Sequence, residues 1–228
     1  MRKIIVGAFV SLDGVMQAPG GPEEDPTGGF RYGGWVAGHW DEAVGQAIGE
    51  NFAEPFDLLL GRRTYDIFAA HWPHVQIDPS ASDFDAQNFA IAERFNSITK
   101  YVATHRPESL TWQNSQGLGD DVVASVRALK QQDGPNLMTQ GSTELLHQLL
   151  AVGLVDRLQL ITFPIVLGKG KRLFDEGSEA RAFELVKSST TSKGVVISSY
   201  ERAGEVATAS FAMENPTDEE LERRRELS

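Results

Sequence analysis

Twice in this sequence a short apolar strand turns through glycine directly into a helix. Residues 56–60 (FDLLL) precede Gly61 and a helix expected over residues 63–70, and residues 136–139 lead through Gly141 into a helix expected over residues 143–152. Strands that alternate with helices in this way predict a mainly parallel sheet, because each helix packs back onto the sheet as a crossover. The expected fold class is therefore α/β.

The remaining elements extend this pattern. Residues 3–10 (KIIVGAFV) form an apolar, β-branched run that is typical of a buried strand. Further strands are expected over residues 101–104 and 157–166, further helices over 41–53, 86–96 and 120–131, and a closing antiparallel pair over 183–189 and 195–202. We therefore expect a mixed, mostly parallel central sheet with flanking helices and an antiparallel C-terminal strand pair.

A glycine-rich stretch follows the first strand, over residues 13–38. Loops of this length in a compact domain are usually functional lids or disordered segments. The aromatic side chains of Trp35 and Trp40 favour a lid that is anchored over a pocket. Asp13, in the sequence Ser-Leu-Asp-Gly, opens this stretch, although Asp-Gly is also ordinary turn chemistry.

Charge and composition limit the ligands of the chain. Its 228 residues carry a formal net charge of −11, and a field of that sign repels nucleic acid and anionic lipid. No apolar run approaches the roughly 20 residues of a membrane-spanning helix, and the start of the chain does not resemble a secretory signal. The sequence has no cysteine, so a thiolate metal site is excluded and a cytoplasmic location is expected.

Both strand–helix turns have the character of anion sites. A helix N-terminus offers free N–H groups and a positive dipole end, and glycine allows a phosphate to approach the backbone closely. Arg62, Arg63 and Thr64 open the first helix, and Ser142 and Thr143 open the second. Two such turns predict a nucleotide lying across the carboxyl edge of the sheet. The alternatives are surface cations at the first turn and a plain strand–helix turn at the second.

The order and spacing of these motifs resemble the dihydrofolate-reductase-like superfamily. The similarity is greatest to the C-terminal reductase domain of the bifunctional riboflavin-biosynthesis deaminase–reductase. It covers roughly residues 3–202 and rests on five segments: Ser-Leu-Asp-Gly at 11–14, Gly-Arg-Arg-Thr at 61–64, Gln-Gly-Ser at 140–142, Gly-Leu-Val-Asp-Arg-Leu at 153–158, and Pro-Ile-Val-Leu-Gly-Lys-Gly at 164–170. The zinc-dependent deaminase half has no counterpart, since no cysteine is present to build its metal site.

This resemblance implies an NADPH-dependent oxidoreductase that reduces a small heterocycle of the pteridine or aminopyrimidine-ribose type. It implies that Arg62, Arg63 and Thr64 hold the 2′-phosphate and pyrophosphate, together with the turn at Gly61. It further places Gly141, Ser142 and Thr143 on the rest of the pyrophosphate, Thr104 on the adenosine side, and Val6, Ala8 and the start of the lid beside the nicotinamide. Asp13, Trp35 and Trp40 are the expected substrate and lid residues. Homodimerisation is also implied.

Asp41 is the catalytic candidate, with Glu42 the next. Dihydrofolate reductases carry a buried acid on the first helix, and burial at Asp41 would raise its pKa and suit it to proton donation. A helix-start aspartate is otherwise a cap. The competing hypothesis is therefore a nucleotide- or pterin-binding module of the same fold without reductase turnover. The five histidines are expected on the surface or in loops, and no metal site is expected.

The chain is expected to divide into a reductase domain over residues 1–212 and a charged helical tail over 213–228. Thr217 and Glu220 form a capping box, and a helix rich in charge follows over 221–227. A solvated terminal helix and a partner-docking arm both fit this pattern.

Overall fold

The structure is a computed structural model, and it describes residues 1–211 and 216–227. Within these residues eight strands form one sheet in the order β4-β3-β2-β5-β1-β6-β8-β7. The strands are β1 (Ile4–Ser11), β2 (Phe56–Gly61), β3 (Lys100–Ala103), β4 (Ser115–Gly117), β5 (Asn136–Gln140), β6 (Arg157–Phe163), β7 (Ala182–Thr190) and β8 (Val196–Gly204). In this order, each strand from β4 through β3, β2, β5 and β1 to β6 pairs in parallel with the next. Strand β8 pairs antiparallel with both β6 and β7. The expected mixed sheet is confirmed.

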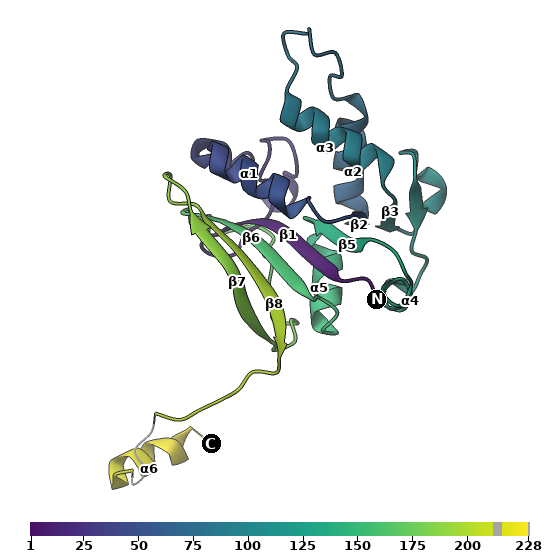
Figure 1. Cartoon of the computed structure of the whole chain (residues 1–228). Helices are drawn as coiled ribbons and strands as arrows, with labels where there is room; N and C mark the ends of the chain where they lie inside the picture. Colours follow the sequence, from purple (N-terminus) through teal and green to yellow (C-terminus); the bar gives the residue numbers. More distant parts are fainter. Residues whose placement is uncertain (212–215, 228) are drawn as a thin grey trace.

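Helices cover both faces of this sheet (Figure 1). The α-helices are α1 (Glu42–Asn51), α2 (Arg62–His71), α3 (Ala86–Ser97), α4 (Val122–Gln131), α5 (Thr143–Ala151) and α6 (Asp218–Glu226). Short 3-10 helices span η1 (Thr27–Gly29), η2 (Ala37–His39), η3 (Trp72–His74) and η4 (Pro107–Ser109). One face packs against α1, α2 and α3, and the other packs against α4 and α5.

The central strand β1 is buried on both faces, and its side chains alternate between them. Ile4, Val6 and Ala8 pack in the apolar cluster that includes α4 and α5. Ile5 and Phe9 belong to the clusters on the opposite face. This alternation decides which residues of β1 face the site described below.

Three elements differ from the sequence-based expectation. The edge strand β4 was not predicted, because Ser115–Gly117 is only three residues long and has no apolar pattern. Strand β6 ends at Phe163 rather than at residue 166, since Pro164 has no N–H to continue the ladder. Helix α6 begins at Asp218, earlier than expected, and the Thr217 hydroxyl accepts from the Glu220 amide at 3.3 Å, as the capping box predicts.

The expected boundary between domain and tail, at residues 212 and 213, lies outside the described residues. No side chain of α6 is buried. In the part of the chain that the structure describes, no helix is both long enough and apolar enough to cross a membrane.

The glycine-rich stretch is folded rather than structureless. Val15, Phe30, Trp35 and Val36 are buried in the apolar cluster that includes α1. The Trp35 indole donates to the Gln17 carbonyl at 2.8 Å and meets the Phe163 ring edge-on. These contacts hold residues 16–25 against the carboxyl ends of the strands.

Candidate functional site

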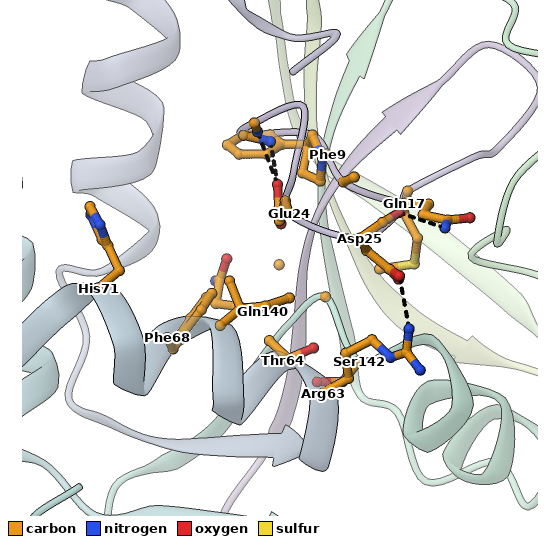
Figure 2. A pocket seen from close by; sticks show the side chains of 18 of the residues that line it. Phe9, Gln17, Glu24, Asp25, Arg63, Thr64, Phe68, His71, Gln140 and Ser142 are labelled. Carbon is orange, nitrogen blue, oxygen red and sulfur yellow. Dashed lines mark hydrogen bonds and ion pairs between the residues drawn. The ribbon is translucent and has the colours of Figure 1, made fainter. Parts of the chain in front are cut away.

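A cavity of about 810 Å³ opens at the carboxyl edge of β1, β2 and β5. This main cavity is bounded by the starts of α2 and α5, by the segment 16–25, and by side chains of α1 and α3. Parallel strands bring their carboxyl ends to one edge, which is where ligands of open α/β sheets bind. Figure 2 shows the cavity with Glu24 on one wall and Phe68 and His71 across from it.

Two helices start at this cavity, and neither has a side-chain cap. The residue before α2 is Gly61, which has no side chain to cap the helix. The residue before α5 is Ser142, whose hydroxyl accepts no hydrogen bond from an amide of α5. By contrast, Asp41, Asp85 and Asp121 cap α1, α3 and α4 through their carboxylates. The first N–H groups of α2 and α5 are therefore available to an anionic ligand, and both dipoles favour one.

The two helix starts are joined directly. The Gly61 amide donates to the Ser142 hydroxyl at 2.9 Å. Gly141 and Ser142 both adopt left-handed backbone, with φ of 69° and 67°. A Cβ on Gly141 would make only ordinary contact with the Thr64 hydroxyl, at 3.5 Å, so it is the left-handed backbone that favours glycine at this turn.

The two arginines of the first turn diverge. Arg62 pairs with Asp66 one helical turn on, and its guanidinium also donates to Ser109 and, at 3.5 Å, to Thr104. Arg63 points the other way and donates to Asp25 at 2.8 Å. Both line the main cavity, with Arg62 toward the end of β3 and Arg63 toward the segment 16–25.

Asp25 ties that segment to the rest of the site. Its buried carboxylate accepts from Lys171 at 2.6 Å, from Thr27 at 2.5 Å and from Arg63. Burial alone would raise the pKa of Asp25, but these hydrogen bonds outweigh it and lower the pKa to about 2. Asp25 therefore stays ionised and holds the two cations in place.

Glu24, the neighbouring acid, has a different environment. One oxygen of its carboxyl accepts from the backbone amides of Gly20 and Gly21, at 2.6 and 3.2 Å. Burial nevertheless raises the pKa of Glu24, because the two amides, which lower it, do not compensate for the loss of water, and the negative charge of Asp25 raises it further.

The structure brings together many, but not all, of the residues expected at the site. Those that line the main cavity are Trp40, Gly61, Arg62, Arg63, Thr64, Gly141, Ser142 and Thr143. Ala8 does not, because it faces the α5 side of the sheet, and the neighbours Gly7 and Phe9 line the cavity instead. Thr104 also lies outside the lining and contacts it only through Arg62.

Asp13 and Trp35 do not line the main cavity; they make contacts that fix the loops around it. The Asp13 carboxylate accepts from the amides of Leu167 and Gly168, at 3.0 and 2.9 Å, and pairs with Arg172. Burial opposes ionisation, but the bonds from Ser11, these amides and Arg172 hold the pKa of Asp13 well below its usual range. Asp13 is thus an anchor between two turns, and Trp35 is a core residue.

The expectation of a buried Asp41 with a raised pKa is wrong. Asp41 is the N-cap of α1 and accepts from the Val44 amide at 3.1 Å. A slight loss of water is outweighed by this bond and by the hydroxyls of Thr191 and Ser192, so the pKa of Asp41 is lowered. Its carboxylate does not line the main cavity.

Several cavity residues were missed by sequence reasoning. They are Gly7, Phe9, Gln17, Glu24, Phe68, His71 and Gln140. His71 ends α2 and is exposed, as expected, and it also lines the cavity. Gln140 precedes the second glycine turn, and that position was the one signal pointing to it. Nothing in the sequence indicated which acid of the glycine-rich stretch would face inward.

Comparison with known proteins identifies the family. The model of the RibD C-terminal domain matches residues 2–197. The chain belongs to the RibD C-terminal domain family. Two relatives from Bacillus subtilis strain 168, YyaP and YwjB, are described as uncharacterized proteins. YyaP is 26% identical over 200 residues, which cover 86% of this chain and 92% of YyaP, and YwjB is 26% identical over 180 residues, which cover 77% and 84%.

Solved structures show the same fold. A putative riboflavin biosynthesis protein from Shewanella sp. PV-4 matches with a TM-score of 0.52 at 20% identity, over 88% of this chain and 98% of that chain. Dihydrofolate reductase from Enterococcus faecalis, complexed with NADP(H) and RAB-propyl, matches with a TM-score of 0.52 at 13% identity, over 88% of this chain and 96% of that chain. The fold is therefore dihydrofolate-reductase-like, as expected.

Proposed function

We propose that the protein is an NADPH-dependent reductase of a small nitrogen heterocycle. The observation that carries the proposal is the pair of uncapped helix starts at one end of a large cavity, joined by the bond between Gly61 and Ser142. The reductase-type fold of the family and the NADP(H) bound to the Enterococcus faecalis enzyme support it.

The residues present fit a dinucleotide. The free N–H groups at the starts of α2 and α5 would hold the pyrophosphate, with the hydroxyls of Thr64 and Thr143 beside them. Arg62, which extends toward Thr104 and Ser109 at the end of β3, would hold the 2′-phosphate and face the adenosine. The opposite end of the cofactor would then lie along β1, beside Gly7 and Phe9.

The reaction we propose is reduction of a ring carbon–nitrogen double bond. Bound NADPH would supply the hydride for the ring carbon and be released as NADP⁺, and a proton from solvent would go to the ring nitrogen. The chain contributes position and exclusion of water, since Phe9, Trp40 and Phe68 form apolar walls beside the expected hydride donor.

A nucleotide-binding module without turnover is the second candidate, and Asp41 is the observation in its favour. The helix-start acid expected to assist protonation is a cap outside the cavity, with a lowered pKa. An enzyme of this design therefore needs another proton source, whereas a module needs none.

Two measurements separate these candidates. Fluorescence titration of the protein with NADPH, beside NADH, tests binding, and we expect NADPH to bind more tightly. Pteridines and aminouracils are then tested as substrates. Oxidation of NADPH is followed by the loss of absorbance of the reduced cofactor at about 340 nm. Turnover establishes the reductase, binding without turnover for any ring favours the module, and absence of NADPH binding contradicts both.

A further inference from the structure

The main cavity has a second end, away from the helix starts, whose walls suit a flat apolar ring. Phe9 and Trp40 meet there edge-on, with ring centroids 6.1 Å apart. Phe68 of α2 lies across from the segment that carries Glu24 (Figure 2), and Ile91 of α3 lines the same cavity. We call this part of the cavity, around Phe9, Trp40, Phe68 and Glu24, the ring end.

The arginines and lysines of the cavity lining lie at the start of α2 or are already paired. Among the described residues that line it, the arginines and lysines are Arg62, Arg63 and Lys171. Arg62 and Arg63 belong to the start of α2. The Lys171 ammonium is 2.6 Å from Asp25, which it shares with Arg63. The described lining of the ring end therefore contains no arginine or lysine to receive a phosphate or a carboxylate; Lys193, whose ammonium donates to the Trp40 carbonyl at 2.7 Å, lies outside that lining.

Glu24 gives the ring end the opposite character. Its two backbone donors, Gly20 and Gly21, both bind the same oxygen, Oε2. Within the described part of the chain, no group donates a hydrogen bond to its other oxygen, Oε1. Glu24 lines the main cavity, and Figure 2 shows its carboxyl on the side of Phe9, held by the two bonds to its own loop, with Phe68 on the opposite wall. The clamp on Oε2 fixes the carboxyl and leaves Oε1 for a ligand.

We propose that the ring end takes a planar nitrogen heterocycle that presents ring N–H and amino donors to Glu24 and carries no phosphate or carboxylate tail. The proposal rests on the proposed function, because it takes the other end of the cavity as the place of the cofactor. The proposed function allows pteridines and aminopyrimidine ribose phosphates as substrates. The present proposal restricts this class to pteridines and aminopyrimidines that are uncharged or cationic and carry no anionic tail.

The physical argument is the balance between desolvation and pairing. An N–H donor that meets a fixed carboxylate in an apolar cavity forms a charge-assisted hydrogen bond, which is stronger than a neutral one. An anionic tail buried in the same place would lose its water without meeting an arginine or lysine of the lining, and it would be repelled by Glu24. The raised pKa of Glu24 agrees with a carboxyl that lacks such a donor in the ligand-free protein.

Matched pairs of ligands test this proposal by calorimetry on the intact protein, with and without saturating NADP⁺. The first pair is 6-methyl-7,8-dihydropterin and 7,8-dihydrofolate, which share a ring and differ in a carboxylated tail. The second pair is 5,6-diaminouracil and its ribosyl phosphate. We expect at least one tailless ring to bind, and to bind about tenfold more tightly than its anionic partner, a difference set by the unpaired charge.

Variants locate the interaction. Glu24→Gln should weaken binding of the tailless ring by about tenfold, since a neutral amide replaces the charged acceptor. Glu93→Gln, an exposed position on α3, serves as the matched control and should leave binding unchanged. Thermal melting of both variants checks that the fold is intact, and NADPH titration of Glu24→Gln should match that of the wild type.

Equal or tighter binding of the anionic partners overturns the proposal, as does unchanged ring binding in Glu24→Gln. Failure of both tailless rings to bind at about 1 mM also overturns it, because a ring end of the stated chemistry should hold at least one of them. Loss of the proposed function has a separate signature, which is a wild-type protein that binds a ring without NADP⁺ but does not bind NADPH.

Discussion

The Gly61 amide donates a hydrogen bond to the Ser142 hydroxyl across 81 residues of sequence, at 2.9 Å. This bond joins the residue before α2 to the residue before α5. It uses the one side chain that would otherwise cap α5, and so it leaves the first amides of both helices free on the same side of the cavity. The proposed pyrophosphate site depends on this arrangement.

Replacement of Ser142 by alanine should remove that link. The Gly61 N–H would lose its acceptor in a partly buried position, so the free energy of unfolding should fall by about 1–3 kcal/mol. NADPH affinity should also fall, by about tenfold, because the two helix starts are no longer held together. Urea unfolding and NADPH titration measure the two effects. Ser82→Ala, at an exposed position, is the control, and equal behaviour of the two variants would contradict the assigned role.

Replacement of Gly7 by alanine should disturb the cavity more than the fold. A Cβ at Gly7 would collide with the end of the Gln140 side chain, which is flexible and can turn into the cavity. We expect a small change in melting temperature and weaker binding of ligands beside β1. The double variant Gly7→Ala/Gln140→Ala, which removes the collision, should bind as Gln140→Ala does. A double variant weaker than both single variants would exclude this mechanism.

Asp25 should make the protein sensitive to acid. Its pKa is lowered in the folded state, so its contribution to stability is complete above the usual value of 3.8 and is lost as pH falls from about 4 toward 2. A shift of this size corresponds to about 2 kcal/mol. Asp25→Asn should therefore be less stable at pH 7 and should lose less stability in this acid range. Unfolding curves at several pH values test this, and parallel pH profiles would refute it.

Binding of a tailless heterocycle should depend on pH through Glu24. The pKa of Glu24 is raised by burial, and the ionised carboxyl is the form that accepts from ring N–H groups. Affinity should therefore increase as pH rises through a range above the usual glutamate value of 4.5 and then level off. Calorimetric titration of a ring that does not itself ionise in this range measures the effect. The dependence should vanish in Glu24→Gln, and its persistence there would assign it to another group.

The sequence indicated the sheet and the phosphate end of the site because both depend on local patterns. The runs before Gly61 and Gly141 are apolar, and the turns after them carry the residues that open α2 and α5. The assignment of Ala8 was less successful because β1 is buried on both faces, so no alternation of polar and apolar residues shows which side chains point to the cavity.

The ring end depends on contacts between distant segments, which no local pattern reveals. Glu24 and Asp25 both line the cavity, but Gly20 and Gly21 bind the carboxyl of Glu24, while that of Asp25 is held by Lys171 and Arg63. Adjacent acids in a glycine-rich loop look equivalent in sequence. Asp41, by contrast, has a role that a local pattern does reveal. Its position at a helix start predicts an N-cap, and in the structure it caps α1.

The most direct test of the account is a fluorescence titration of NADPH and NADH against the wild type, Arg62→Ala and Arg127→Ala. Arg127 is exposed on α4, across the sheet from the main cavity, and serves as the control. We predict that the wild type and Arg127→Ala prefer NADPH, and that Arg62→Ala loses about tenfold in NADPH affinity with little change for NADH. Absence of NADPH binding by the wild type would contradict the central claim that the starts of α2 and α5 form a cofactor site.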